Sequence, residues 1–321
     1  MTAAPHLPVL LERTVELLSA APEGLIVDAT LGAGGHAAAL LEARLARHGH
    51  AALLGVDRDP DALALAAERL ATVAADPRVE LTLARARFDE LPRVLEDHGR
   101  PRISGVLLDL GISSMHVDRP ERGFSYRAEG PLDMRMDPDL PTTAGDLVNG
   151  LAAEELARLL RRYADEQHAG RIARAIVAAR PLSTTLELAE VVRDAVPAAA
   201  RRRGGHPATR TFQALRIAVN AELEALDAVL PAVIDHLAVG GVAVVIAYHS
   251  LEDRPVKRAF AAAATGCICP PGLPVCGCGR QARVEHLVRR PLRPDPAELA
   301  ANPRASAARL RAVRRLPEEP S

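Results

Sequence analysis

Short apolar runs recur along the first third of the chain, and a helical pattern separates each run from the next. The runs are rich in Leu, Ile and Val and are short enough for buried strands. Between them, apolar residues recur every three to four positions, which predicts helices. The expected strands are Leu25–Val27, Ala51–Val56, Val79–Leu83 and Ile103–Leu108, and the expected helices include Ala37–His48 and Ala62–Ala74. This alternation predicts an α/β fold with a doubly wound sheet.

The alternation stops between residues 118 and 206, where no convincing buried strand is predicted. Helical patterns follow one another there instead, at Ala152–Tyr163, His168–Ala179 and Leu186–Val196. The sheet pattern resumes at Val242–Tyr248. We therefore expect an inserted all-helical domain within a sheet-bearing domain.

The expected division is 1–118 for the first part of the sheet-bearing domain, 119–206 for the insertion and 207–321 for the second part. Thr209–Leu237 predicts one long amphipathic helix with a break near Pro231. From Arg280 onward the chain is rich in arginine and punctuated by proline. This composition predicts a basic extension wrapped over the domain rather than a third domain.

The most informative stretch is GLIVDATLGAGGH, residues 24–36, in which an apolar run leads into an acid and a glycine-rich turn. Gly32, Gly34 and Gly35 let the backbone turn tightly and lie close to a ligand. The spacing Gly32-x-Gly34-x-x-Ala37 satisfies the loose dinucleotide fingerprint. Taken alone, the stretch fits a nicotinamide enzyme and an S-adenosylmethionine enzyme equally well.

Three acids, Asp28, Asp57 and Asp109, are expected at strand ends. Asp57 lies about 25 residues beyond Gly32, where a nucleotide-binding unit places an acid that accepts hydrogen bonds from ribose hydroxyls. A nicotinamide domain uses that acid but has no evident use for the other two. S-adenosylmethionine carries a sulfonium, an amino group and ribose hydroxyls, so acids around the glycine turn favour a methyl donor.

The composition gives no overall signal for nucleic acid, because the formal net charge is -1. Any RNA contact must come from a local basic face, which we expect at Arg201, Arg202 and Arg203 and among the C-terminal arginines. No apolar run is long enough to span a bilayer, and the first residues lack the features of a signal peptide. These observations predict a cytoplasmic protein with no membrane partner.

All four cysteines fall within one segment, as Cys267-x-Cys269 and Cys276-x-Cys278. Two close pairs in a reducing compartment indicate a metal before a disulfide, yet C-x-C is tighter than the usual C-x-x-C zinc spacing. We therefore expect ordinary thiols in a surface loop and no metal, with a structural zinc as the alternative.

Several sequence blocks point to one known family. In chain order they are HxPVLLERT, VDATLGAGGH, GVDRDPDAL, LLDLGISS, RGFSYRAEGPLDMRMD, HPATRTFQALRIAVNAEL, YHSLEDRPVKRAF and NPRASAARLR. Together they resemble the ribosomal RNA small-subunit methyltransferase H (MraW) family over nearly the whole chain. The resemblance implies a class I (Rossmann-like) methyltransferase domain with an inserted helical domain. It also implies S-adenosylmethionine-dependent methylation of the exocyclic N4 of a cytidine in the decoding region of 16S rRNA, within the assembled small subunit.

The resemblance also implies the residues that bind the methyl donor. These positions are Gly34, Gly35, His36, Asp57, Phe88 and Asp109. A further position, normally a glutamine in the family, is His116 here, and its ring couples donor to acceptor through the tautomer. Tyr248 stands where the family commonly has Phe, which adds a hydroxyl group.

The expected reaction needs a group that accepts a proton. Cytosine N4 is a poor nucleophile because its lone pair is delocalised into the ring, so the enzyme must orient the amine and accept its proton. Asp109 and His249 are the predicted catalytic acceptors. The chain has no tryptophan, so a stacking partner for the base would be Phe124, Tyr126 or Tyr248, each of which the sequence favours as a core residue.

Two rival functions remain open on the sequence. A nicotinamide dehydrogenase with the same fold would bind NAD tightly and would not bind S-adenosylmethionine. A non-catalytic ribosome-assembly factor with a vestigial donor site would bind the small subunit and transfer no methyl group. The intact glycine turn and the three acids argue against such a loss of activity. The sequence also leaves a homodimer open.

Overall fold

The computed structural model describes residues 8–201, 205–269 and 277–318. The chain forms two compact units: a sheet unit made of Met1–Gly111 and Glu224–Ser321, and a helical unit made of Ile112–Leu223. The helical unit is wider at both ends than the range of 119–206 expected from the sequence. Among the described residues, no helix combines the length and apolar character needed to cross a membrane.

A seven-stranded sheet forms the centre of the sheet unit, in the order β3-β2-β1-β4-β5-β7-β6. The first five strands in that order run parallel, whereas β7 is antiparallel to both β5 and β6. The strands are β1 (Leu25–Asp28), β2 (Ala51–Asp57), β3 (Val79–Arg85), β4 (Ile103–Asp109), β5 (Leu237–Ala247), β6 (Val284–His286) and β7 (Arg309–Arg315). The predicted α/β fold with a doubly wound sheet is confirmed.

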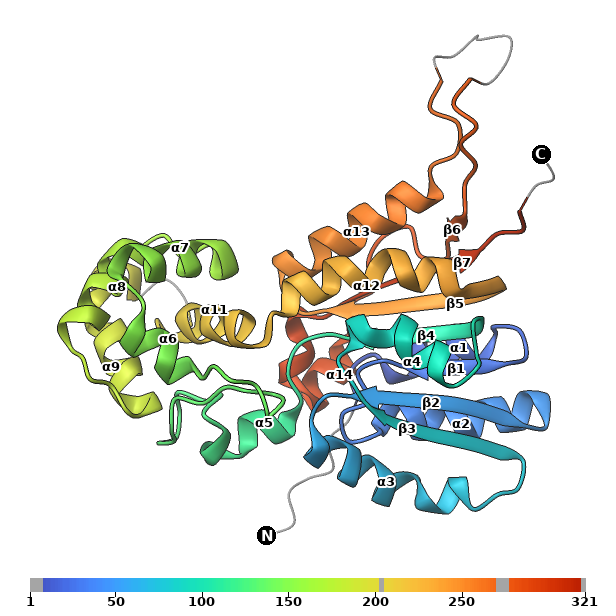
Figure 1. Cartoon of the computed structure of the whole chain (residues 1–321), viewed down its shortest axis with the longest axis horizontal. Coiled ribbons are helices and arrows are strands. Elements are labelled where there is room, and N and C mark those ends of the chain that lie inside the picture. Colours follow the sequence, from blue (N-terminus) through green and yellow to red (C-terminus); the bar gives the residue numbers. More distant parts are fainter. Residues whose placement is uncertain (1–7, 202–204, 270–276, 319–321) are drawn as a thin grey trace. The chain divides into compact units, whose positions relative to one another are not determined.

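Helices cover both faces of this sheet (Figure 1). Neighbouring strand residues point to opposite faces, so Val27 packs in the core formed with α4, α12 and α13, whereas Ile26 packs in the core formed with α1, α2 and α3. The helices are α1 (Leu11–Ser19), α2 (Gly35–His48), α3 (Pro60–Ala74), α4 (Leu91–Asp97), α12 (Glu222–His236), α13 (Ser250–Ala264) and α14 (Pro296–Ala301). Strands buried on both sides explain the nearly continuous apolar runs in the sequence.

The expected long helix at Thr209–Leu237 is two helices, and the predicted break position is wrong. The first, α11 (Thr209–Asn220), ends where Ala221 adopts a left-handed backbone conformation with φ 49°. Pro231 lies inside α12 without ending it. An alanine rarely adopts positive φ, so no local signal in the residues predicts a break there.

The C-terminal segment contributes two strands to the sheet, which the sequence analysis did not expect. In β7, the aliphatic residues Leu310, Ala312 and Val313 are buried, whereas Arg311 reaches Asp253 of α13 with distances of 2.6 and 3.0 Å. The frequent arginines concealed the strand pattern. These arginines form ion pairs within the sheet unit: Arg309 also lies near Asp253, Arg314 near Glu285 and Arg315 near Glu318.

The helical unit has its own apolar core and contains no strand among its described residues. Its helices are α5 (Ser114–Asp118), α6 (Ala144–Gly150), α7 (Ala153–Ala164), α8 (Ala169–Ala178), α9 (Thr185–Ala195), α10 (Ala198–Arg201) and α11. The buried amide of Asn220 accepts from the N–H of Met136 and donates to the carbonyls of Met134 and Arg216. This amide ties α11 to the irregular segment before α6.

One buried arginine fixes the connection between α1 and β1. The guanidinium group of Arg44 donates to the carbonyl oxygens of Leu18 and Ala21 from Nη1, and to those of Pro22 and Gly24 from Nη2, at 2.8 to 3.4 Å. Its side chain is almost fully buried on α2. Arg44 therefore supplies a side-chain donor to carbonyl groups of the turn before β1.

Arg44→Met should destabilise the sheet unit by about 3 kcal/mol, because several buried carbonyl groups lose their donor. The free energy of unfolding in urea measures the effect. Arg47→Met is a matched control on the same helix; Arg47 is exposed, so its replacement should cost less than about 0.5 kcal/mol. Equal effects of the two substitutions would contradict a structural role for the Arg44 contacts.

Candidate functional site

The carboxyl ends of β1, β2 and β4 carry Asp28, Asp57 and Asp109, and we call this region the acidic edge. These three strands are adjacent, with β1 between β2 and β4. The carboxyl ends of parallel strands in an open α/β sheet are where ligands bind. All three strand-end acids therefore meet where a ligand site is expected.

Asp57 holds the glycine turn in place. Its Oδ2 accepts a hydrogen bond from the N–H of Gly32 at 2.8 Å, and its Oδ1 accepts from the N–H of Asp59 at 2.9 Å. Each carboxylate oxygen has a second lone pair, so Asp57 can still accept from hydroxyl groups of a ligand. The predicted role toward a ribose thus stays open beside a structural role that the sequence analysis did not foresee.

Gly34 and Gly35 are glycines for steric reasons at the start of α2. Gly34 has a φ of 75°, and a Cβ there would lie 3.3 Å from the Cα of Ala66 on α3. A Cβ on Gly35 would lie 2.5 Å from the Cγ of Pro8. The turn is therefore packed tightly between α3 and the segment before α1. Their predicted role in donor binding stays a prediction.

Asp28 is fully buried at the end of β1. Its Oδ1 accepts from the N–H of Thr30 at a distance of 3.3 Å. Burial raises the pKa of Asp28 to about 8; the charges of Asp109 and Asp57 add to this rise, and the hydrogen bond from Thr30 opposes it. Asp28 is thus largely protonated near neutral pH and organises the start of the turn.

Asp109 connects several elements of the site. Its N–H donates to Oγ1 of Thr30 at 2.6 Å, and its Oδ1 accepts from the hydroxyl of Tyr248 at 2.8 Å. Burial raises the pKa of Asp109 to about 7, and the charge of Glu252 adds to the rise, whereas the hydrogen bond from Tyr248 lowers the pKa. Asp109 can therefore change its protonation state near neutral pH.

His36 lies beside Asp109 at the first turn of α2. Its Nδ1 is 3.7 Å from Oδ2 of Asp109, and its Nε2 is 3.0 Å from the carbonyl oxygen of Val9. Because a carbonyl oxygen only accepts, Nε2 carries a proton, and Nδ1 is the nitrogen that can take a second one. The resemblance assigned His36 to donor binding; the structure in addition places its ring against Asp109.

Tyr248 and His249 follow β5 and are held by the buried carboxylate of Glu252. Oε2 of Glu252 accepts from the N–H groups of Tyr248 and His249, at 2.8 and 3.3 Å. Nδ1 of His249 accepts from the N–H of Glu252 at 3.3 Å, and Nε2 lies 3.0 Å from Oε1 of Glu252. His249 therefore caps α13, and its ring faces Glu252. The Tyr248 ring lies against Gly111, whose φ is 99°.

The other two residues predicted to bind the methyl donor, Phe88 and His116, lie in different surroundings from the acidic edge. Phe88 begins a short 3₁₀ turn (Phe88–Glu90) after β3 and packs partly buried against the core near α4. His116 belongs to the helical unit, where it is buried with its ring centre 4.8 Å from that of Phe124. The ring of Tyr126 stacks on His206 at 4.5 Å. Among the aromatic stacking candidates, Tyr248 contacts Asp109 through its hydroxyl.

The predicted RNA-binding arginines are only partly described. Arg201 is exposed on α10, with Nη1 3.9 Å from Oδ1 of Asp194. Arg202 and Arg203 lie outside the described residues. The arginines of β7 pair with acids of the sheet unit. These ion pairs give them a structural role, and their contact with RNA stays a prediction.

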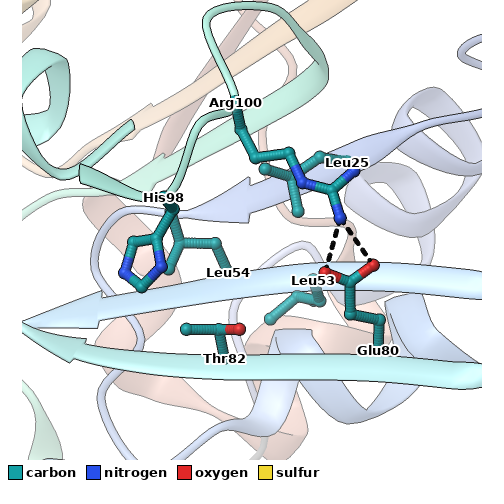
Figure 2. A pocket seen from close by; sticks show the side chains of 7 residues that line it. All are labelled: Leu25, Leu53, Leu54, Glu80, Thr82, His98 and Arg100. Atoms are coloured by element: carbon teal, nitrogen blue, oxygen red, sulfur yellow. Dashed lines mark hydrogen bonds and ion pairs between the residues drawn. The ribbon is translucent and has the colours of Figure 1, made fainter. Parts of the chain in front are cut away.

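Figure 2 shows a small pocket in the sheet unit, lined by residues of β1, β2 and β3 and by His98 and Arg100. Its volume is about 100 Å³, and Glu80 at the start of β3 pairs across it with Arg100 at 2.6 Å. Ligand sites usually have volumes of about 300 Å³ or more. Its location beside the first residues of β1 and β3, together with its size, separates it from the candidate site.

The acidic edge suits a ligand that carries positive charge. Burial raises the pKa values of Asp28 and Asp109, and a cation beside these acids would favour their ionised forms. Asp57 offers further acceptors beside the glycine turn. The sulfonium and amino groups of S-adenosylmethionine, with its ribose hydroxyls, match this arrangement.

The contacts of two residues in this arrangement could not be predicted from the sequence. Thr30 joins Asp28 to Asp109 through its N–H and its Oγ1, and Glu252 holds the backbone of Tyr248. The only signal for Thr30 was a hydroxyl residue between the first acid and the glycine turn. Tyr248 was noted for its hydroxyl, but the partner of that hydroxyl became evident only in the structure.

Comparison with known proteins gives consistent matches. The model of the MraW methylase family matches residues 3–316. The chain is 49% identical over 315 residues to a ribosomal RNA small subunit methyltransferase H of Heliobacterium mobile, covering 97% of this chain and 99% of that protein. It is 52% identical over 320 residues to a protein described in the same words from Acidothermus cellulolyticus, covering 98% and 94%. A solved rRNA methylase structure from Streptococcus thermophilus aligns with 96% of this chain and 94% of its own, with a TM-score of 0.38 and 14% identity.

Asp28→Asn should remove a pH dependence of folding stability. The pKa of Asp28 is about 8 in the folded chain against an ordinary value of 3.8. The unfolded chain therefore binds fewer protons between these values, and the wild-type protein loses stability as the pH rises through this range. The stability of the variant relative to the wild type should grow by about 1 kcal/mol per pH unit between about pH 5 and pH 8.

Urea unfolding at several pH values measures this difference. Asp76→Asn is the control, because Arg78 lowers the pKa of Asp76 to about 2 and its carboxyl is then ionised throughout the range. Its effect on stability should stay constant between about pH 5 and pH 8. A constant difference for Asp28→Asn as well would contradict the protonated state of the buried carboxyl.

Proposed function

The chain belongs to the MraW methylase family, and on this premise we propose that it methylates the exocyclic N4 of a cytidine in the decoding region of 16S rRNA. It is an S-adenosylmethionine-dependent methyltransferase of small-subunit rRNA with a class I (Rossmann-like) fold. The proposed substrate is this RNA within the assembled small subunit, in the cytoplasm. A homodimer is compatible with this role.

The observation that supports the proposal most directly is the raised pKa of Asp109. An exocyclic amine must lose a proton when it gains a methyl group, and a general base works best when its pKa is near the operating pH. Asp109, at the end of β4 and beside the glycine turn, has a pKa raised to about 7. A solvated carboxylate would be a weaker base.

S-adenosylmethionine, when bound, supplies an electrophilic methyl group on its sulfonium. We assign Gly34, Gly35, His36, Asp57, Phe88, Asp109 and His116 to its binding. Within the sheet unit, Asp57 holds the turn and offers acceptors to hydroxyl groups, while Asp28 and Asp109 favour positive charge near them.

Asp109 is the stronger of the two predicted proton acceptors. Oδ1 already accepts from Tyr248, so Oδ2, on the side of His36, is the oxygen best able to accept from the N4 amine. Nδ1 of His249 already accepts from the N–H of Glu252, and its Nε2 lies 3.0 Å from Oε1 of the same residue, so the ring is engaged at the start of α13. We assign His249 a positioning role through Glu252 and Tyr248.

The geometry also favours Tyr248 as the aromatic residue nearest the reacting base. Its hydroxyl contacts Asp109, whereas Phe124 is buried in the core of the helical unit. Burial, together with the charge of Asp109, raises the pKa of Tyr248 well above its ordinary value. Tyr248 therefore remains a hydrogen-bond donor toward Asp109.

Methyl transfer to small subunits isolated from cells that lack the enzyme tests the proposal. With isotopically labelled S-adenosylmethionine, nucleoside analysis should show label on N4 of cytidine.

Asp109→Asn should lower kcat by about a hundredfold or more, because the base is lost. Asp97→Asn, at the exposed end of α4, is the matched control and should keep kcat near that of the wild type. Label on a ring carbon or a ribose oxygen would overturn the N4 assignment, and unchanged kcat in Asp109→Asn would overturn the role of Asp109.

Tyr248→Phe should move the acidic limb of the pH–rate profile to higher pH. The hydrogen bond from Tyr248 lowers the pKa of Asp109, so its loss raises that pKa further. Since the ionised form of Asp109 accepts the proton, kcat/KM should reach half its maximum at a pH higher by about one unit. Tyr163→Phe, the same change in the helical unit, should leave the midpoint in place. A lower rate with an unmoved midpoint would assign Tyr248 to packing alone.

A further inference from the structure

A cysteine-bearing segment connects α13 to β6 in the sheet unit. Its described residues leave α13 after Ala264 and return before Val284, and Figure 1 shows these two stretches running together between the two elements. Cys267 and Cys269 lie on the outgoing stretch, and Cys278 lies on the returning one. Cys276 lies outside the described residues.

Hydrogen bonds hold the two stretches together at their base. The N–H of Arg283 donates to the carbonyl of Ala263 at 2.8 Å, and Nη2 of Arg280 donates to the carbonyl of Ala262 at 2.7 Å. A Cβ on Gly266 would lie 3.6 Å from the backbone N of Ala282. The thiols that follow are therefore brought close by a defined scaffold that continues from a long helix.

The sulfur atoms have the separation of zinc ligands. The Sγ atoms of Cys267 and Cys278 are 3.8 Å apart, and those of all three described cysteines lie within 4.8 Å of one another. Zinc–sulfur bonds of about 2.3 Å in a tetrahedron place two sulfurs about 3.8 Å apart. A disulfide would need a separation of about 2.05 Å. The geometry is that of a cluster of metal ligands.

We propose that Cys267, Cys269 and Cys278 form a structural zinc site. Thiolates are soft ligands that select zinc among the common divalent metals, and structural zinc sites use three or four cysteines. Three thiolates leave one position of the tetrahedron for a further ligand. The C-x-C spacing that argued against zinc on the sequence matters less, because the fold brings Cys278 to the other two cysteines although it lies 11 residues beyond Cys267.

Such a site would join the two stretches of the segment beyond the contacts at their base. The neighbouring contacts of Arg280 and Arg283 lie on the side of the cluster nearer α13. Cys267 and Cys278 are exposed, so apolar burial cannot hold the two stretches together there. Metal binding would link the stretches without such burial. The site is independent of the acidic edge and of the proposed reaction.

Metal analysis of the full-length protein tests the site. Protein purified with a thiol reductant and without chelator should contain about one zinc per chain, with little iron or copper. Cys267→Ser, Cys269→Ser and Cys278→Ser should each reduce the zinc content at least severalfold. Ile268→Ala changes the exposed residue between two of the cysteines and should retain the zinc. Zinc retained by all three serine variants, or iron or copper in its place, would overturn the proposal.

A second measurement uses only the wild-type chain, in case the variants fold poorly. A mercurial thiol reagent should release the zinc, as followed with a chelating dye. Cobalt(II) added to chelator-treated protein should produce the near-ultraviolet absorption of thiolate-to-cobalt charge transfer. The absence of both signals, or a disulfide between Cys267 and Cys278 in the reduced preparation, would contradict a metal site.

Discussion

The carboxyl group of Asp109 lies between Tyr248 and His36, its backbone N–H donates to Thr30, and the arrangement of the candidate site depends on these contacts. Each partner comes from a different element, so β1, β4, β5 and α2 must all be in place before the carboxyl is buried. Burial of an acid disfavours its charge. The sheet therefore both creates a base with a raised pKa and lines the space beside the glycine turn.

A second set of contacts, made by the first turn of α13, supports this arrangement. Glu252 holds the backbone of Tyr248, and the next residue, Asp253, accepts from Arg311 of β7. The first turn of α13 is thus fixed on one side by the site and on the other by the antiparallel strand. This chain of contacts links a C-terminal arginine to the orientation of the tyrosine that controls Asp109.

The sequence predicts those parts of the fold that have a regular apolar period. The four strands up to Ile103–Asp109 and the three helices predicted for the insertion lie close to their expected ranges. Burial on both faces makes such strands continuously apolar. The break at Ala221 and the strand at Arg309–Arg315 were missed, since tertiary contacts override local preference at both places. The acids of the site follow from strand ends, but Thr30 and Glu252 act through contacts that no spacing reveals.

The discontinuity of the sheet unit also has a consequence for the order in which the chain can fold. The helical unit is continuous in sequence and encloses its own core, so it can fold as soon as its residues are available. Strand β4 pairs with β5, and β5 pairs with β7, so these pairings need strands that follow the insertion in the chain. Contacts of such long sequence separation form slowly. We therefore expect the helical unit to fold before the sheet that carries the acidic edge is complete.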